Sequence, residues 1–338
     1  MKQAIMTEPG KIIYNEVPEP QPGAGQVKLK MERIGVCGSD IHVWHGKHPY
    51  TSYPVVQGHE VSAVVVETGS GVTEFAVGDR VTVMPQVVCK ECYPCTHGMY
   101  NDCNSLKVMG FQTTGMASEY FVADAAWVLK LPEGLSADLG AVLEPLACGV
   151  HAVRRFGDVT GKKCVVLGGG TIGNLVGQAL RAMGAGQVLL SEVSACRLEK
   201  AAACGLTIHS PAEKPLDEAI RDAFGDDGAD VIFECIGNGK VLNQAVEIAR
   251  KGSAIIVMGV VADPYPINMG LVQDHELSMI GTAMYRIEDW KKAIELVGQG
   301  LINLEILITH HVPFTCYEDA YRLIEEQKDK AMKVMIDM

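Results

Sequence analysis

A glycine-rich turn between an apolar strand and a helix is the feature that most constrains the fold of this chain. Residues 164–167 (CVVL) are predicted to form the strand, residues 168–173 read GGGTIG, and residues 171–183 are apolar at helical spacing. The G-x-G-x-x-G pattern is weak alone, but between a strand and a helix it predicts a dinucleotide-binding βαβ unit. Its glycines permit a tight turn and let the backbone at the helix N-terminus approach a pyrophosphate.

The alternation of strands and helices continues after this turn. Further elements are predicted at residues 188–190, 231–233, 254–258 and 277–280 (strands) and 197–204 (a helix). Repeated βαβ units with apolar strands predict a parallel sheet that helices cover on both faces. The fold class is therefore α/β, with a doubly wound nucleotide-binding domain expected over residues 148–286.

The rest of the chain is predicted to be mostly β. β-branched or alternating runs at 27–31, 61–66 and 80–83 are separated by turns rich in glycine and proline. Other elements are expected at residues 135–153, 290–297 and 317–326 (helices) and 333–336 (a strand). With 338 residues the chain is long enough for two cores. We expect residues 1–147 and 287–338 to form one domain, which the nucleotide domain interrupts.

An acidic residue after the second predicted strand bears on the choice of cofactor. Glu192 follows the glycine turn by roughly 20 residues, where a carboxylate accepts hydrogen bonds from the adenosine ribose and repels a 2′-phosphate. This favours NAD over NADP, although Arg197 nearby lies where it can cover the adenine or meet a phosphate. The residues predicted to contact NAD are Gly168, Gly170, Thr171, Ile172, Gly173, Glu192, Arg197, Ile236, Gly259 and Thr282.

Four closely spaced cysteines predict a metal site in the mostly β part. Cys89, Cys92, Cys95 and Cys103 have the spacing C-x2-C-x2-C-x7-C. Four thiolates at this density can form a tetrahedron around one ion, which is how structural zinc is usually held. We expect a zinc-binding lobe over about residues 86–106.

A second set of potential metal ligands is scattered along the same part. Cys37, His59, Glu60 and Glu144 supply a thiolate, an imidazole and carboxylates, a combination that suits catalytic zinc with an open position. Near Cys37, Ser39 is placed to hydrogen-bond a substrate hydroxyl and His42 to pass its proton to solvent. Asp40 is a candidate to orient the ligand imidazole. We predict Ser39, His42, Glu60 and Glu144 as the catalytic residues.

Composition narrows the function classes. The net charge of -12 disfavours binding to nucleic acid or to an anionic membrane surface. We find no membrane-spanning run and no secretory signal. The eleven cysteines are an odd number in a chain of ordinary size, which does not suit a secreted disulfide scaffold. A cytoplasmic location is expected.

With these motifs in place, the chain resembles the zinc-dependent medium-chain dehydrogenase/reductase family over essentially its whole length. The likeness is greatest to the polyol (sorbitol-type) and threonine dehydrogenase branch, and the segment CGSDIHVW starting at Cys37, Gly58-His59-Glu60, the four cysteines and Glu144-Pro145 carry it. The resemblance implies a GroES-like catalytic domain, a Rossmann domain, two zinc ions per chain and a homodimer or homotetramer. Cys37, His59 and Glu60 would bind the catalytic zinc, and Glu144 would bind it directly or through water.

The resemblance also singles out residues for the substrate. Ser39, Phe111, Glu144, Tyr285 and Arg286 are the candidates. The order Tyr285-Arg286 reverses the Arg-Tyr pair of sorbitol dehydrogenases, and the residues after Gly110 fall in a segment that varies within the family. Sorbitol itself is therefore not implied, and an arginine here leaves sugar acids and sugar phosphates open.

The expected function is reversible, zinc-dependent, NAD-linked oxidation of a secondary alcohol to a ketone on a polyol, sugar or sugar-acid substrate. L-threonine 3-dehydrogenase activity is the alternative within enzymes. A zinc-bound protein that senses nucleotides or mediates interactions without catalysis is the alternative from another class. A nucleic-acid-binding zinc ribbon would need a basic surface, which the net charge of -12 argues against.

Overall fold

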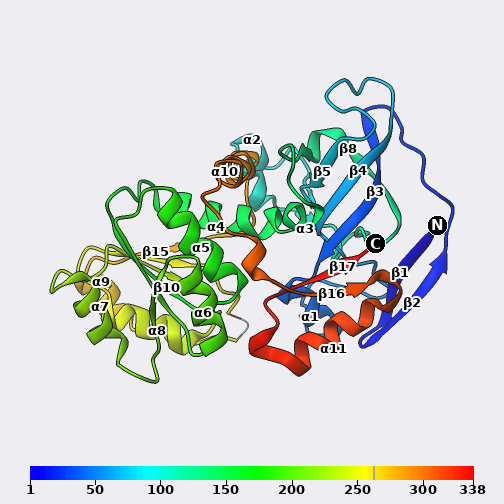
Figure 1. Ribbon diagram of the computed structural model, residues 1–338. Helices are drawn as coiled ribbons and strands as arrows, with labels where there is room; N and C mark the ends of the chain where they lie inside the picture. The colour runs from blue at the N-terminus through cyan, green and yellow to red at the C-terminus, as the bar shows by residue number, and fades with distance from the viewer. Residues whose placement is uncertain (262) are drawn as a thin grey trace. The chain divides into compact units, whose positions relative to one another are not determined.

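The computed structural model describes residues 1–261 and 263–338, and the chain divides into two units (Figure 1). Unit 1 comprises residues 1–144 and 308–338, and unit 2 comprises residues 145–307. The first boundary agrees closely with the sequence prediction, but the second lies well after residue 286. The helix at residues 287–298 belongs to unit 2 because its Asp289 is buried in ion pairs with His151 and Arg154 of that unit.

The main sheet of unit 1 has seven strands in the order β16-β17-β3-β4-β5-β9, with β8 also paired to β3. Their bounds are β3 Gln26–Gly35, β4 Glu60–Thr68, β5 Arg80–Val83, β8 Tyr120–Asp124, β9 Val128–Lys130, β16 Ile308–Pro313 and β17 Lys333–Asp337. Strand β17 comes from the C-terminal segment and pairs antiparallel with β3, so the two ends of the chain build one sheet. The strands predicted at residues 27–31, 61–66, 80–83 and 333–336 are confirmed.

Shorter elements complete unit 1. They are the strands β1 Lys2–Glu8, β2 Lys11–Glu16, β6 Gln86–Val87 and β7 Lys107–Val108, and the helices α1 Gly38–Trp44, α2 Tyr93–Thr96, α3 Ala137–Ala141 and α11 Tyr317–Gln327. Short 3-10 helices occur at Tyr100–Asp102, Ala125–Trp127, Phe314–Cys316 and Lys328–Lys330. Alternate residues of β3 and β4 point into the core, where Leu29, Met31, Ala63 and Val65 are almost completely buried.

Unit 2 contains a parallel sheet of six strands in the order β12-β11-β10-β13-β14-β15. The strands are β10 Lys163–Leu167, β11 Gln187–Ser191, β12 Thr207–His209, β13 Val231–Glu234, β14 Ala254–Val257 and β15 Ser278–Gly281. The chain runs outward from β10 to β12 and then returns to β13 on the other side of β10. This order leaves a crevice at the carboxyl ends of β10 and β13, where open parallel sheets bind ligands.

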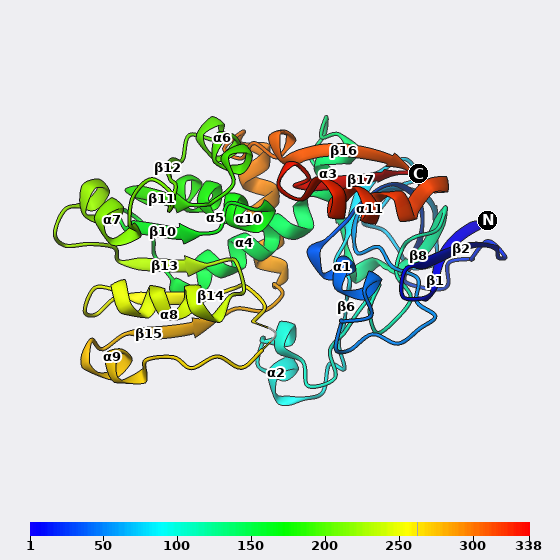
Figure 2. The same cartoon turned by 90° about the horizontal axis from the view of Figure 1, so that it is seen from below.

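Helices cover both faces of this sheet (Figure 2). They are α4 Leu143–Phe156, α5 Thr171–Ala182, α6 Ala195–Ala203, α7 Leu216–Phe224, α8 Gly239–Ile248, α9 Met269–Asp274 and α10 Ile287–Gly298, with a 3-10 helix at Glu305–Leu307. The predicted doubly wound α/β architecture is thus confirmed. Strand β12, which the sequence did not indicate, has only three residues and lies at the sheet edge. In the described part of the chain, none of the helices is long and apolar enough to cross a lipid bilayer.

Candidate functional site

The four predicted cysteine ligands lie together in the loop between β6 and β7. The Sγ atoms of Cys89 and Cys103 are 3.6 Å apart, and the Cys89–Cys95 and Cys92–Cys103 separations are both 3.9 Å. A tetrahedron of thiolates with metal–sulfur bonds of about 2.3 Å has edges of about 3.8 Å, so this set fits zinc. Backbone N–H groups of Asn104 and Cys95 lower the pKa of Cys92 to about 6, which favours the thiolate needed for ligation.

Strand pairing in unit 1 explains why the second set of ligands converges. Gly35 at the end of β3 pairs with Glu60 at the start of β4. Cys37 follows β3 as the N-cap of α1, and His59 immediately precedes β4, so the register brings the thiol and the imidazole side by side. One ligand atom from each of Cys37, His59 and Glu60 lies within 4.8 Å of the others. His59 and Glu60 are buried, whereas Cys37 is half-buried.

Asp40 orients this set from the first turn of α1. One of its oxygens accepts a hydrogen bond from the backbone N–H of Cys37 at 2.9 Å, and the other lies 3.6 Å from Nδ1 of His59. The second oxygen also accepts a bond from Gln57, whose amide oxygen in turn accepts one from the Tyr321 hydroxyl. A buried chain of side chains therefore runs from α11 to the His59 imidazole. The predicted orienting role of Asp40 agrees with this geometry.

The charges around His59 suit a bound cation. Burial opposes a charge on the imidazole, but Asp40 and then Cys37 outweigh it and raise the pKa of His59 to about 10. Nδ1 of His59 is buried and makes no hydrogen bond within the described residues, while the thiol of Cys37 interacts with the ring. A divalent ion held by nitrogen, sulfur and oxygen donors matches both observations, and three protein ligands leave a position open, as in catalytic zinc sites.

Lys333 is a buried partner of this set that sequence reasoning missed. Its ammonium group donates to both carboxylate oxygens of Glu60 and to the carbonyl of Val36. Burial opposes its charge, but Glu60 prevails and the pKa of Lys333 lies above its ordinary value. Glu60 is therefore held by β17 in this structure, and its contact with zinc stays a prediction. No local motif marks Lys333, because it is 273 residues from Glu60 in sequence.

The other predicted catalytic residues lie near this set. Ser39 and His42 are both on α1, the first half-buried and the second exposed to solvent. Glu144 is 6% exposed at the start of α4, and its charge contributes to the raised pKa of His59. The placement of all three agrees with the predicted roles, which no contact in this structure tests.

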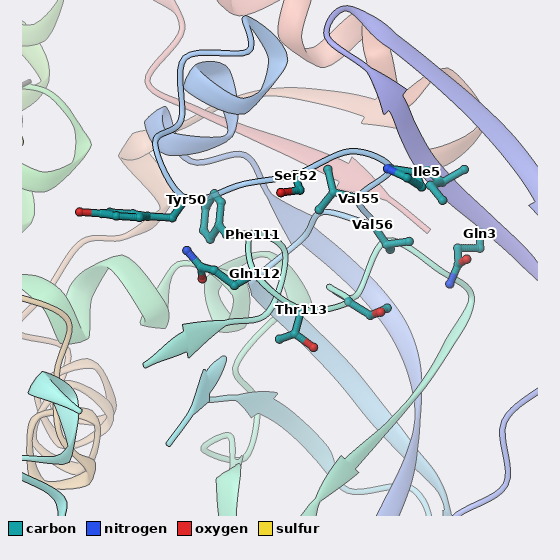
Figure 3. A pocket seen from close by; sticks show the side chains of 11 residues that line it. Gln3, Ile5, Tyr50, Ser52, Val55, Val56, Phe111, Gln112 and Thr113 are labelled. Atoms are coloured by element: carbon teal, nitrogen blue, oxygen red, sulfur yellow. The ribbon is translucent and has the colours of Figure 1, made fainter. Parts of the chain in front are cut away.

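Phe111 lies between the ligand set and a cavity. Its ring is tilted against that of His59, with centroids 4.9 Å apart, and stacks on His48 at 4.7 Å. Phe111 also lines a cavity of about 520 Å³, together with Tyr50 and Gln112 (Figure 3). His48, which the sequence did not single out, thus lies beside the predicted substrate residue Phe111. Burial lowers the pKa of His48, and the nearby His42 and His59 lower it further.

In unit 2 the glycine turn has the geometry that the motif predicts. A Cβ atom on Gly173 would lie 1.8 Å from the carbonyl oxygen of Gly168, so only glycine lets α5 pack this close to the turn. The backbone of Gly168 has a φ of +96°, which favours glycine as well. Gly170 precedes the first residue of α5, Thr171, at the helix N-terminus, with Ile172 next to it.

Glu192 lies at the end of β11 and holds the same turn. One carboxylate oxygen accepts from the N–H of Gly169 at 2.8 Å, and the other accepts from the N–H groups of Val193 and Ser194. Arg197 lies 3.7 Å from this carboxylate. Glu192 and Gly168 line a cavity of about 370 Å³ that also includes Ile236. Three of the predicted cofactor residues, Gly168, Glu192 and Ile236, therefore border one cavity.

The remaining predicted site residues of unit 2 differ from one another in burial and packing. Gly259 approaches Gly237 so closely that a Cβ would lie 1.9 Å from its backbone nitrogen, and Thr282 is half-buried after β15. Arg286 is half-buried at the start of α10. Tyr285 is completely buried and packs edge-on against Trp290, with ring centroids 5.3 Å apart. Its side chain serves packing here, and the predicted contact of Tyr285 with substrate is disfavoured.

Comparisons with known proteins agree with the two-unit architecture. Residues 23–133 match the family of alcohol dehydrogenase GroES-like domains, and residues 171–299 match the family of zinc-binding dehydrogenases. The chain is 35% identical to a sorbitol dehydrogenase of Halalkalibacterium halodurans over 99% of both sequences. It is 30% identical to the L-galactonate-5-dehydrogenase of Escherichia coli over 95% of this chain and 94% of the relative.

A solved structure extends the likeness to three dimensions. The crystal structure of an alcohol dehydrogenase from Escherichia coli, complexed with NADH, superposes with a TM-score of 0.92. It is 31% identical in sequence and covers 100% of this chain and 99% of its own. The fold that positions the two ligand sets and the glycine turn is thus shared along the entire length of the chain.

Proposed function

The chain belongs to the zinc-dependent alcohol dehydrogenase family, and we propose that it catalyses the reversible, NAD-linked oxidation of a secondary alcohol to a ketone on a polyol, sugar or sugar-acid substrate. The observation that carries this proposal is the convergence of Cys37, His59 and Glu60 to within 4.8 Å beside the aromatic ring of Phe111. The similarity to a sorbitol and an L-galactonate dehydrogenase supports a small hydroxylated substrate.

The residues of unit 1 divide the work around the metal. When bound by Cys37 and His59, zinc supplies Lewis acidity that lowers the pKa of a hydroxyl group. Asp40 lies 3.6 Å from Nδ1 of His59, where it would orient the ring as a carboxylate behind a ligand imidazole usually does. The half-buried Ser39 hydroxyl would accept the proton of the alcohol while it passes its own proton to the exposed His42 ring, which then releases a proton to water.

Glu60 and Lys333 form the other side of the site. The ammonium group of Lys333 donates to both carboxylate oxygens of Glu60. Held in this way beside Cys37 and His59, Glu60 is the first carboxylate that we propose as a zinc ligand. Glu144, buried nearby, is the second carboxylate that we propose as a direct or water-mediated ligand.

Glu192 supports the choice of NAD as the hydride acceptor. Its carboxylate is fixed by three backbone N–H groups, so it cannot easily turn away from the cofactor hollow. A fixed negative charge there disfavours the 2′-phosphate of NADP. We further propose that the chain works in the cytoplasm. We also propose that it is a homodimer or homotetramer, and a measurement of the molar mass in solution tests this oligomeric state.

The first experiment measures zinc per chain and NADH formation with polyols, sugar acids, sugar phosphates and threonine. We expect two zinc ions per chain and turnover of one hydroxylated class with NAD. Turnover of threonine alone would make the chain an L-threonine 3-dehydrogenase. Full zinc content with no turnover of any alcohol would contradict the proposal and favour a protein that binds nucleotide without catalysis.

The cofactor proposal has its own test. Replacing Glu192→Ser removes the carboxylate that faces the ribose, so we expect kcat/KM with NADP to rise relative to NAD by at least about 10-fold. Glu199→Gln on the exposed face of α6 removes the same charge outside the hollow and serves as the control. An unchanged ratio in both variants would contradict the role of Glu192.

A further inference from the structure

We propose that the cavity next to Phe111 in unit 1 binds the uncharged, hydroxylated part of the substrate that lies away from the reacting carbon. This inference rests on the proposed function and narrows its substrate class to neutral polyols. The cavity has a volume of about 520 Å³, which is within the range of about 300–1,000 Å³ of small-molecule sites (Figure 3).

The first argument is the charge of the lining. Among the described residues that line the cavity there is no lysine, arginine, histidine, aspartate or glutamate. A carboxylate or phosphate placed here would lose hydration without gaining an ionic partner, and burying an unpaired charge is costly. A neutral hydroxyl chain pays no such penalty. The cavity therefore discriminates against acids and phosphates at that end of the substrate.

The second argument is the hydrogen-bonding capacity that the protein leaves unused. The hydroxyl groups of Ser52, Thr113 and Thr114 and the amide of Gln3 line the cavity. None of these four side chains makes a hydrogen bond to another residue in the described part of the chain. Gln112 differs, because its oxygen accepts from the N–H of Val108 and only its NH2 group is left over. Hydroxyls and amides that both donate and accept match a polyol.

The third argument is the aromatic surface of the cavity. The ring of Tyr50 is 74% exposed, although a large aromatic side chain is usually at least partly covered. Tyr50 and Phe111 both line one end of the cavity (Figure 3). A flat aromatic face can pack against the C–H side of a sugar chain while the hydroxyls bond elsewhere. This combination of exposed aromatic ring and neutral polar groups suits a carbohydrate-like ligand.

The connection to the reacting centre runs through Phe111. Its ring contacts both the cavity and the ligand His59, from which its centroid is 4.9 Å away. His48 stacks on the same ring at 4.7 Å and accepts or donates a hydrogen bond with Thr51 at 2.7 Å. The position of Phe111 is thus fixed from the His48 side. The cavity therefore lies one aromatic ring away from the metal ligand His59.

The test compares substrates of different length and charge. In the zinc-loaded enzyme with NAD, we expect kcat/KM to rise from a tetritol to a hexitol of matched stereochemistry and to be lower for the corresponding hexonate. Thr113→Val and Ser52→Ala each remove a hydroxyl and should lower kcat/KM for the hexitol by about 2- to 10-fold, with little change for the tetritol. Tyr50→Ala should reduce the hexitol preference, and Tyr50→Phe should restore it.

Thr73→Val is the matched control, because Thr73 is an exposed residue of unit 1 outside the cavity. Thr114→Lys tests the charge argument directly, because it adds a positive charge to the lining of the cavity. The ratio of hexonate to hexitol turnover should rise by about 10-fold in this variant, as expected for one charge-assisted hydrogen bond. Equal losses for tetritol and hexitol, or a wild-type preference for the hexonate, would overturn the inference.

A binding measurement separates this inference from the proposed function. Saturation-transfer NMR with a hexitol and the zinc-loaded protein should show contact with the sugar chain, and the Tyr50→Ala and Thr113→Val variants should weaken it. If the enzyme turns over no alcohol at all, the proposed function itself is contradicted. Turnover of hexitols that is unaffected in all cavity variants would leave the proposed function standing and refute the cavity as a subsite.

Discussion

The two sets of metal ligands in unit 1 share a chemistry but differ in how the fold builds them. The four cysteines lie within residues 89–103, in one loop that brings their Sγ atoms to within 4.8 Å of one another. The other set takes Cys37, His59 and Glu60 from two strand ends, where Asp40 bonds the backbone of Cys37 and Lys333 bonds Glu60. The four cysteines come from one short segment and are mostly half-buried. The ligands of the other set come from separate segments and are mostly buried.

This difference indicates what stabilises each site: the bound metal at the first, and hydrogen bonds between side chains at the second. The cysteine loop has short elements and few buried residues, so the metal itself is expected to order it. The buried set already has oriented side chains, because Asp40 and Lys333 hold its ligands by hydrogen bonds. Loss of zinc should therefore disturb structure at the first site and chemistry at the second.

The largest effect is expected for Cys37→Ser. Without the thiolate the buried set loses one of its three ligands, and we expect kcat/KM to fall by at least about 10⁴-fold, equivalent to about 5.5 kcal/mol. The unfolding temperature should change little, because Asp40 still bonds the backbone N–H of residue 37. Steady-state kinetics and zinc analysis check this, and retention of more than one-tenth of the activity would contradict the catalytic assignment.

Cys92→Ser should have the opposite signature. We expect one zinc per chain instead of two, and a free energy of unfolding lowered on the order of 4 kcal/mol, because the metal supplies folding energy to such loops. Limited proteolysis should then cut within the loop at residues 86–106. Cys196→Ser on α6, far from both sets in sequence, is the control. Normal zinc content and normal proteolysis would show that the four cysteines hold no structural metal.

Lys333→Met tests the assembled site from the C-terminal strand. Removing Lys333 leaves Glu60 buried without its ion-pair partner, so the free energy of unfolding should fall by about 3 kcal/mol. The zinc content of the buried set should also become sensitive to chelators, because Glu60 is no longer held. Lys330→Met, an exposed lysine of the same segment, is the control. Equal denaturation midpoints for both variants would refute the structural importance of the pair.

The smallest effect is expected for Tyr321→Phe, which removes the hydroxyl at the far end of the Asp40 chain. The lost hydrogen bond to Gln57 should cost about 1 kcal/mol and weaken zinc binding at the buried set by about 10-fold. Tyr14→Phe removes a hydroxyl that donates to the Phe314 carbonyl and accepts from the N–H of Tyr317, so it should lower stability at least as much without affecting zinc. Identical zinc affinities of the two variants would show that the chain from α11 does not reach the metal ligands.

The sequence alone was enough where the physical signal is local. The glycine turn, the alternating strands of unit 2 and the four cysteines each lie within a short segment, so spacing and hydrophobic periodicity reveal them. Cys37 and His59 were singled out by their chemistry and by the resemblance to a family, and their role as zinc ligands stays a prediction. The second domain boundary did not follow from the sequence, because burial of Asp289 against α4 decides it.

Only the tertiary structure revealed the contacts between residues that lie far apart in the sequence. Lys333 contacts Glu60 only because β17 pairs with β3, and Tyr321 reaches Gln57 only because α11 packs into the same core. Neither contact has a spacing that a single sequence can show. Likewise Tyr285 seemed a substrate residue from its position, but packing against Trp290 buries it completely. The sequence determined which chemical groups and local motifs are present, and long-range packing determined which groups meet, because contacts between distant segments depend on strand pairing and core burial rather than on local spacing.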